Sequence, residues 1–283
     1  MDLHAGAKST DDTEFAVLTA QTLIDCGGNI SLEKVGASWK RYILDEGGAR
    51  ERGGFPLYGA VANLERGIMP PRSGTENVFN DDDGAAMRIA PVGILCAGNP
   101  KRAVELAEID ASVSHARDGI WGAQAVAAGV AVAMTGAPLG EVIDAGISCI
   151  PDRSWLANAM GRAMEIVDNA ASIEDAWDPL HDQLWTAQHA ACAEALPQAF
   201  AMLRLTEGDF RQGMIWAGNF GRDADTIGAI VGAIAGAMGG EPAIPTHWID
   251  KIDSPAGVCL RFAAQRSMRQ LADDLVALHR AEQ

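Results

Sequence analysis

The sequence is short of positive charge and of paired cysteines, and each shortage excludes a class of protein. It has 22 Lys and Arg residues against 38 Asp and Glu, so the formal net charge at pH 7 is −16. A field of that sign repels nucleic acid and anionic membranes, and we expect neither as a partner. The five cysteines are scattered and form no Cys-x-x-Cys pair. We therefore expect reduced core cysteines in a cytoplasmic protein.

Signals for export or membrane insertion are also weak. Residues 1–4 have neither the basic start nor the apolar stretch of a signal peptide. Residues 119–140 form an uncharged run long enough to raise the question of a membrane span. That run is mostly Ala and Gly, however, and it contains Gln124, Thr135 and Pro138. We expect a buried helix there.

Strand-type alternation is nearly absent, whereas apolar residues recur at helical spacing along most of the chain. Asn99 followed by Pro100 is a helix start, and Ser154 stands where an N-cap would begin another helix. No shift of composition and no linker rich in Ser and Pro divides the 283 residues. The sequence therefore predicts an all-α protein with one compact multi-helix domain, covering residues 1–283.

The most informative stretch is residues 218–240, GNFGRDADTIGAIVGAIAGAMGG. Asp223, Asp225 and Thr226 come first, and an uncharged helical run follows. Glycines recur at every fourth position of that run: Gly228, Gly232, Gly236 and Gly240. This spacing places them on one helix face, and glycine is about 1 kcal/mol worse than alanine in a helix, so we expect another helix packed closely there.

A similar motif, Ser-Thr-Asp-Asp-Thr at residues 9–13, also precedes a helical stretch. Taken alone, either motif is consistent with an ordinary N-cap in a solvated turn. Together they supply carboxylates and hydroxyls without nearby Cys or His, a donor set that suits Mg²⁺ or Mn²⁺ rather than zinc. We expect the two motifs to converge between helix N-termini and to hold two divalent cations. The candidate metal ligands are Thr10, Asp11, Asp12, Asp223, Asp225 and Thr226.

Residues 9–13 and 221–228 resemble the two metal motifs of the ADP-ribosylglycohydrolase family, which includes the dinitrogenase-reductase-activating glycohydrolases. Further segments fall in the family's order, so that the similarity covers nearly the whole chain: 84–88, 114–115, 194–197 and 244–248. The resemblance implies an all-α fold and hydrolysis of a glycosidic bond. It also implies a substrate site that includes Asp83, Gly84, Met87, His115, Gly221 and Arg222.

Two features depart from the family pattern. The residue before Gly84 is commonly asparagine, but here it is Asp83, in the acidic loop Asp81-Asp82-Asp83. A carboxylate there repels a pyrophosphate, which favours a less anionic ribosyl substrate than ADP-ribose. Family members also usually carry a helix with a Gly-Asp-Ala-x-Gly motif well before the first metal motif. Only nine residues precede Thr10, so we expect that helix to be absent.

The leading hypothesis is a metal-dependent hydrolase of N- or O-glycosidic bonds that acts on ADP-ribosylated or simpler ribosylated substrates, either small molecules or protein-linked. Cleavage through an oxocarbenium-like state needs an activated water, and Asp83 or a free oxygen of Asp12 is the candidate base. Two alternatives remain open. Paired carboxylates equally suit a two-metal phosphoester hydrolase, and a non-catalytic relative of the family would also retain the fold.

Overall fold

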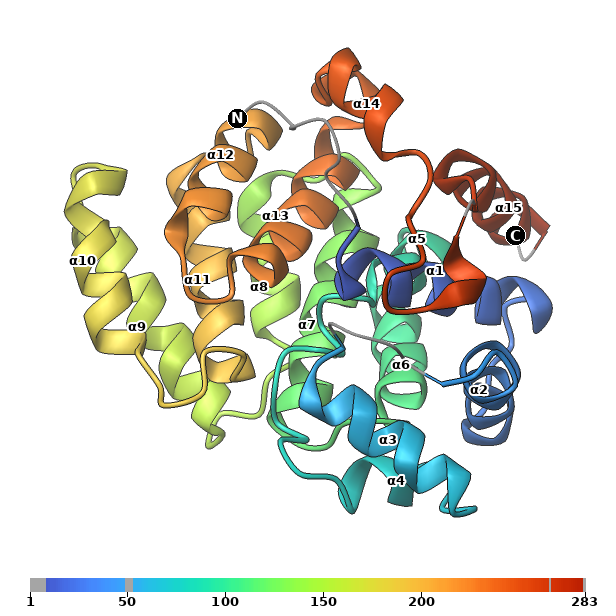
Figure 1. The fold of residues 1–283 in the computed structure, drawn as a ribbon. Coiled ribbons are helices and arrows are strands. Elements are labelled where there is room, and N and C mark those ends of the chain that lie inside the picture. Colours follow the sequence, from blue (N-terminus) through green and yellow to red (C-terminus); the bar gives the residue numbers. More distant parts are fainter. Residues whose placement is uncertain (1–8, 49–52, 265, 282–283) are drawn as a thin grey trace.

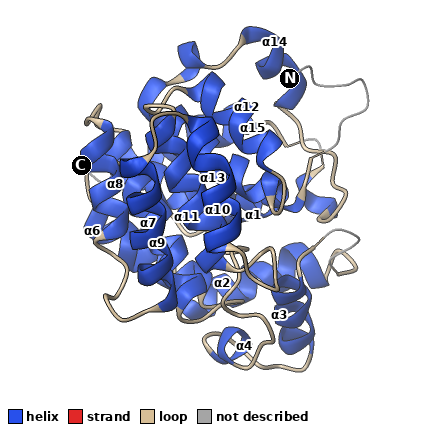
Figure 2. Cartoon of the chain, turned by 90° about the vertical axis from the view of Figure 1, so that its left-hand side faces the viewer, coloured by secondary structure: helices blue, strands red, loops and turns tan. Residues whose placement is uncertain are grey.

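The computed structural model describes residues 9–48, 53–264 and 266–281. Within these ranges, all of the regular secondary structure is helical. Figure 2 shows helices joined by loops, with no strand in this part of the chain. The all-α expectation is confirmed. The prediction that residues 1–4 are not part of a signal peptide concerns residues outside the described ranges.

The first half of the chain forms helices of very different lengths. They are α1 (Asp11–Asp25), α2 (Leu32–Trp39), the π-helix η1 (Lys40–Leu44), α3 (Phe55–Glu65), α4 (Arg72–Thr75), α5 (Ala90–Leu95), α6 (Pro100–Ala111) and α7 (Asp118–Ala133). The second half is built in the same way. It contains α8 (Leu139–Ile147), α9 (Trp155–Asn169), α10 (Ile173–Leu184), α11 (Cys192–Leu205), α12 (Phe210–Phe220), α13 (Ala224–Gly239), the 3₁₀ turns η2 (Glu241–Ala243) and η3 (Arg261–Ala263), α14 (Thr246–Ile252) and α15 (Met268–Ala281).

Helix α7 is the centre of the single core and is surrounded by other helices (Figure 1). It packs against α5, α6, α8, α11 and α13, and nearly all of its residues are buried. Its many alanines leave room for neighbours to approach closely, because side chains in protein cores pack without voids. The buried helix expected within residues 119–140 is thus confirmed. Among the described residues, no helix is both long and apolar enough to span a membrane.

Two predicted helix starts are confirmed in detail. The side chain of Asn99 accepts a hydrogen bond from the backbone N–H of Arg102 at 3.1 Å, with Pro100 in the first position of α6. Ser154 accepts one from the N–H of Ala157 at 2.9 Å and begins α9. These caps satisfy N–H groups that have no partner within their own helices.

The glycine face of α13 packs against α12, as the spacing predicted. A Cβ added at Gly232 would lie 3.0 Å from the sulfur of Met214, and one at Gly236 would lie 3.7 Å from the ring of Phe210. The fourth glycine differs from expectation. Gly240 is the residue after the helix end, with a φ of 64°, a left-handed conformation that glycine adopts without a steric penalty.

Helix α13 also contacts α1, so the beginnings of two helices from opposite ends of the sequence meet (Figure 1). Helix α13 packs against α7, α11 and α12, and helix α1 packs against α5 and α15. Both helix N-termini are therefore fixed by the main core. The motifs that precede them meet at this junction.

Candidate active site

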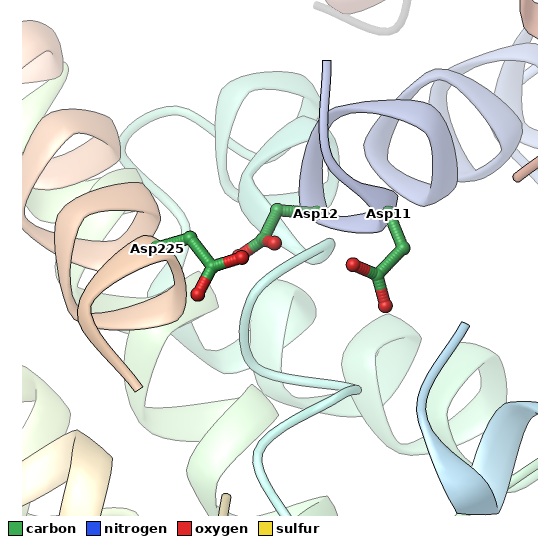
Figure 3. Close-up of side chains that lie close together, drawn as sticks. All are labelled: Asp11, Asp12 and Asp225. Atoms are coloured by element: carbon green, nitrogen blue, oxygen red, sulfur yellow. The ribbon is translucent and has the colours of Figure 1, made fainter. Parts of the chain in front are cut away.

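Three carboxylates of the two motifs converge at the junction of α1 and α13. One ligand oxygen each from Asp11, Asp12 and Asp225 lies within 4.8 Å of the others. In Figure 3, Asp11 and Asp12 extend from the first turn of α1, and Asp225 extends toward them from α13. The prediction that the two motifs meet between helix N-termini is confirmed.

The motif residues at the N-cap positions do not act as ordinary caps. Thr10 and Asp223 occupy these positions of α1 and α13, and neither side chain makes a capping hydrogen bond. The hydroxyl of Thr10 instead donates to Asp12 Oδ2 at 2.8 Å. The alternative of a simple capped turn therefore loses its support, and the oxygen atoms are directed toward one another.

The two carboxylates on α1 are costly to ionise. Burial, and after it the charge of Asp225, raises the pKa of Asp12 to about 6. Burial, and after it the charge of Asp12, raises the pKa of Asp11 to about 7. Asp12 Oδ1 is buried and has no hydrogen-bond partner among the described residues. A buried polar atom without a partner destabilises the fold by about 1–3 kcal/mol, so a ligand bound to this oxygen would stabilise the protein.

Asp223 and Asp83 complete the acidic group. Burial, and after it the hydrogen bond and charge of Asp225, raises the pKa of Asp223 to about 8. Asp83 is 2% exposed, and burial together with the charges of Asp223 and Asp82 raises its pKa well above the ordinary value. Its Oδ2 also lacks a hydrogen-bond partner in the described part of the chain. Carboxylates held this close, with unpartnered oxygens, fit a hard divalent cation.

Asp83 lies in a short loop that is held against the start of α11. Its N–H donates to the carbonyl of Ala190 at 2.9 Å, and the carbonyl of Asp81 accepts from the N–H of Cys192 at 3.1 Å. The Asp83 carbonyl accepts from the N–H of Met87 at 3.1 Å. The loop is thus paired on one side with a distant segment and continues on the other into the turn that leads to α5.

The other predicted substrate residues lie around this loop to different degrees. Gly84 and Met87 are buried, and the hydroxyl of Thr226 contacts the Met87 sulfur at 3.9 Å, which joins the second motif to the acidic loop. Gly221 is exposed, with a φ of 81°. His115 is fully buried, and both of its ring nitrogens are engaged by protein groups.

Arg222 makes its hydrogen bonds with residues outside the two motifs. Its guanidinium donates to Glu194 Oε2 at 2.9 Å and to the carbonyl of Thr186 at 2.7 Å, and it lies 5.5 Å from the centre of the Trp185 ring. Glu194 also accepts from the N–H of Thr186 at 2.7 Å. In this conformation Arg222 supports the loop before Asp223, and its role toward a substrate stays a prediction.

Sequence reasoning missed Glu14, which is fully buried behind the first motif. Its carboxylate accepts the N–H groups of Val258, Cys259 and Leu260 at 2.7–2.8 Å, and the hydroxyl of Ser9 at 2.6 Å. These donors tie the start of α1 to a segment near the end of the chain. Only its position two residues after Asp12 could have drawn attention to it.

An exposed aromatic pair near the site was also missed. The backbone of Gly54 lies near the Asp11 carboxyl and acts to lower its pKa, against the larger effect of burial, and the next residue, Phe55, is 70% exposed. Its ring lies 5.6 Å from that of Phe79, which is itself exposed. Trp121 and Trp216, which lie near motif residues in the sequence, pack against the core.

Comparisons with known proteins show the family to which the chain belongs. The model of the ADP-ribosylglycohydrolase family matches residues 2–283. An uncharacterised protein of Archaeoglobus fulgidus is 31% identical over 98% of this chain and 83% of its own length. The protein YegU of Escherichia coli is 27% identical over 84% of this chain and 73% of its own length.

A third relative and a solved structure extend the comparison. The ADP-ribosylarginine hydrolase Tri1 of Pseudomonas putida is 23% identical over 88% of this chain and 63% of its own length. A structure titled "ADP-ribosylglycohydrolase-related protein complex" covers 97% of this chain and 82% of its own, with a TM-score of 0.62 and 24% identity, which supports the fold. With the family model matching residues 2–283, the chain belongs to the ADP-ribosylglycohydrolase family and is a hydrolase of the glycosidase type.

Proposed function

We propose that this protein is a metal-dependent hydrolase that cleaves the N- or O-glycosidic bond between an ADP-ribosyl or simpler ribosyl group and its aglycone. The observation that carries the proposal is the convergence of Asp11, Asp12 and Asp225 from two helix N-termini. Their donor chemistry and the family membership support the same reading. A cytoplasmic location, which five free cysteines favour, is part of the proposal.

The residues that would hold two divalent cations, Mg²⁺ or Mn²⁺, are those of the two motifs: Thr10, Asp11, Asp12, Asp223, Asp225 and Thr226. Bound there, such cations would supply Lewis acidity and orient the ribose hydroxyls. The protein groups around them exclude water from one side, because Asp12 and Thr226 are each less than 5% exposed. Negative charge from the unligated oxygens would stabilise the oxocarbenium-like state of the sugar.

Asp83 is the candidate general base. It is buried, its Oδ2 is unpartnered among the described residues, and its pKa is raised. A carboxylate with a raised pKa is a stronger base than an ordinary one. Its role would be to take the proton of the attacking water. Asp12 Oδ1, also unpartnered in the described structure, is the second candidate.

Relatives indicate which aglycone to test first. One carries the name ADP-ribosylarginine hydrolase, and a Rhodospirillum rubrum protein, 38% identical over 24% of this chain and 21% of its own length, is named ADP-ribosyl-[dinitrogen reductase] glycohydrolase. We therefore propose arginine-linked ADP-ribose, free or on a protein, as the first substrate. The acidic surroundings of Asp83 favour a simpler riboside as the second.

One experiment separates the proposal from its rivals. The purified protein is incubated with ADP-ribosylarginine, an ADP-ribosylated protein and an uncharged riboside, with Mg²⁺, Mn²⁺ or a chelator, and products are read by mass spectrometry. We expect free ADP-ribose or ribose only when metal is present. Inorganic phosphate would favour the phosphoester hydrolase, and no product in any mixture would favour a non-catalytic relative.

The substrate's charge is tested with Asp83→Asn. Removing this carboxylate should raise the affinity of the metal-loaded protein for ADP-ribose relative to an uncharged riboside, by at least about tenfold or 1.4 kcal/mol. Calorimetry measures both affinities, and Asp81→Asn serves as the matched control for net charge. If the wild type binds ADP-ribose tightly and Asp83→Asn weakens it, Asp83 is a hydrogen-bonding substrate ligand and the electrostatic argument is wrong.

A further inference from the structure

A series of hydrogen bonds begins at a buried arginine and ends at the residue before Asp83. Arg88 is fully buried, and its Nε donates to Asp110 Oδ1 at 3.0 Å. Its Nη2 donates to Ser114 Oγ at 3.0 Å, and its Nη1 to the carbonyl of Gly84 at 2.9 Å. None of these groups holds metal or protons in the proposed reaction. A buried charge with this many fixed partners nevertheless specifies its surroundings closely.

The directions of these hydrogen bonds follow from the groups at the two ends. The Asp82 carboxylate only accepts, so His115 carries a proton on Nε2, which faces Asp82 Oδ1 at 2.6 Å. In a neutral ring Nδ1 then accepts the hydrogen of Ser114, 2.7 Å away, while the Ser114 oxygen accepts from Arg88. Burial lowers the pKa of His115, which favours the neutral ring that this arrangement requires. The tautomer of His115 is thereby fixed.

The end of this series of hydrogen bonds holds both neighbours of Asp83. The oxygen of Asp82 that accepts from His115 also accepts from the N–H of Gly84, at 2.9 Å. The carbonyl of the same glycine accepts from Arg88. The residues before and after Asp83 are therefore tied to one network, while the Asp83 side chain keeps an oxygen without a partner in the described structure.

His115 has no room for a substrate. Its ring is fully buried, and a Cβ added at Gly84 would lie 3.3 Å from it, while one at Gly119 would lie 2.8 Å from it. Two glycines thus leave only enough space for the imidazole itself. Both ring nitrogens are already satisfied, so a substrate would have to break a buried hydrogen bond to reach either of them.

We propose that Arg88, Ser114, His115 and Asp82 form a relay that positions the Asp83 carboxyl for proton transfer, so that His115 affects the reaction through Asp83 without touching the substrate. The inference rests on the proposed function, because it takes Asp83 as the base. Displacement of a reacting group by about 1 Å can reduce a rate by about 100-fold, which gives the relay a measurable effect.

The test is a double-mutant cycle on the full-length, metal-loaded protein. Ser114→Ala removes the link between Arg88 and His115 without adding charge, and we expect kcat to fall about 10- to 100-fold with KM changed less than about twofold. Ser112→Ala, two residues away, is the matched control, since the Ser112 hydroxyl donates to the carbonyl of Glu108 and lies outside the relay. Its kinetics should equal those of the wild type.

The second half of the cycle places Ser114→Ala in the Asp83→Asn background. If the relay acts through Asp83, the second substitution has no further effect on kcat, whereas independent contributions multiply. Equal losses in both backgrounds, or a rise in KM as large as the fall in kcat, would overturn the proposal in favour of a direct substrate contact. Metal affinity, measured by calorimetry, should be the same in the wild type and in Ser114→Ala.

The relay itself is tested without any substrate. The ¹⁵N NMR spectrum of the imidazoles should show His115 as the neutral Nε2–H tautomer in the wild type, and the His115 Nδ1 resonance should shift in Ser114→Ala because that nitrogen loses its hydrogen-bond donor, while His279→Gln removes one unrelated histidine signal for assignment. Another tautomer overturns the proposal whether or not the protein is active. The correct tautomer in a protein that cleaves no glycosidic bond contradicts the proposed function and reduces the relay to a structural element.

Discussion

The two motifs, residues 9–13 and 221–228, carry the same kinds of side chain at the start of a helix, yet the protein supports them differently. Behind the first, Glu14 accepts three backbone N–H groups from residues 258–260. Behind the second, Glu194 accepts the guanidinium of Arg222, whose side chain is 27% exposed. The first support is mostly main chain, and the second combines one backbone N–H, that of Thr186, with a long side chain that reaches the surface.

The difference indicates which half of the site is rigid. Backbone amides have no rotamers to lose, whereas a guanidinium reaches Glu194 through several rotatable bonds. Gly221 and Arg222 also both have positive φ values, 81° and 55°, and the second is costly for a residue with a side chain. We infer that the first motif is the fixed half of the site and the second the adaptable half.

The largest expected effect comes from removing one carboxylate on either side. Asp12→Ala and Asp225→Ala should each abolish metal binding and activity while leaving the helices formed, because the remaining oxygens cannot supply the several ligands a hard cation prefers. Calorimetry with Mn²⁺ and circular dichroism measure the two properties. Asp178→Ala, an exposed aspartate on α10, is the control. Unchanged metal affinity in either variant would refute shared ligation by the two motifs.

The two supports should differ in energy. Glu14→Gln leaves buried N–H groups facing an amide, and we expect it to lower the free energy of unfolding by about 3 kcal/mol or more, while Glu194→Gln lowers it by about 1–2 kcal/mol. Denaturant unfolding of the two variants measures the difference. A larger loss for Glu194→Gln would reverse the assignment of the rigid and the adaptable half.

The acidic cluster should make metal-free stability depend on pH in an unusual direction. The pKa values of Asp12, Asp11 and Asp223 in the folded protein are about 6, 7 and 8, above the 3.8 of a free carboxyl. The folded state therefore binds protons more tightly than the unfolded state between about pH 4 and 8, so its stability rises as the pH falls through that window.

With a chelator, the unfolding temperature should be several degrees higher at about pH 5.5 than at about pH 8. Ordinary carboxylates are ionised at both pH values and do not contribute to this difference. Saturating Mn²⁺ should reverse the order, because metal ligands must lose their protons. Asp225→Ala should flatten the metal-free dependence, since the charge of Asp225 contributes to the raised pKa of all three groups. A metal-free protein that is more stable at pH 8 would contradict this electrostatic account.

The smallest expected effect concerns the helix that carries the second motif. A Cβ at Gly228 would meet Met214 at an ordinary 3.8 Å, so Gly228→Ala should stabilise the protein by about 0.5–1 kcal/mol through helix propensity. Gly232→Ala, whose Cβ would approach Met214 to 3.0 Å, is the paired variant and should gain less. Thermal unfolding of both variants decides. Equal gains would mean that α12 does not limit the glycine face.

Much of the architecture followed from local chemistry. Helical periodicity predicted an all-α fold, and Asn99 and Ser154 indicated helix starts. The similar side chains of residues 9–13 and 221–228 predicted that these two motifs lie close together. Each of these predictions rests on a short segment of the sequence. Gly240 was placed inside a helix because its spacing continued the pattern, although a glycine at a helix end serves equally well to terminate it.

The supports of the site could not be predicted because their partners are distant in sequence. Glu14 accepts hydrogen bonds from the backbone amides of residues 258–260. Nearly every residue has such an amide, so the sequence does not indicate which ones act as donors. The pairing of Asp83 with Ala190 is equally invisible. The relay through Ser114 and His115 required knowledge of which atoms are buried together, which no spacing rule supplies.

The contact between Glu14 and residues 258–260 also sets an order of events during synthesis. The first metal motif is made early, yet neither Asp225 nor the amides that hold Glu14 exist until most of the chain has been translated. Because domains grow from the N-terminus, helices such as α6 and α7 can pack while the acidic cluster is still incomplete. Under the proposed function, the complete set of carboxylates that would bind metal therefore forms only late in synthesis, because Asp11 and Asp12 lack Asp225 until then.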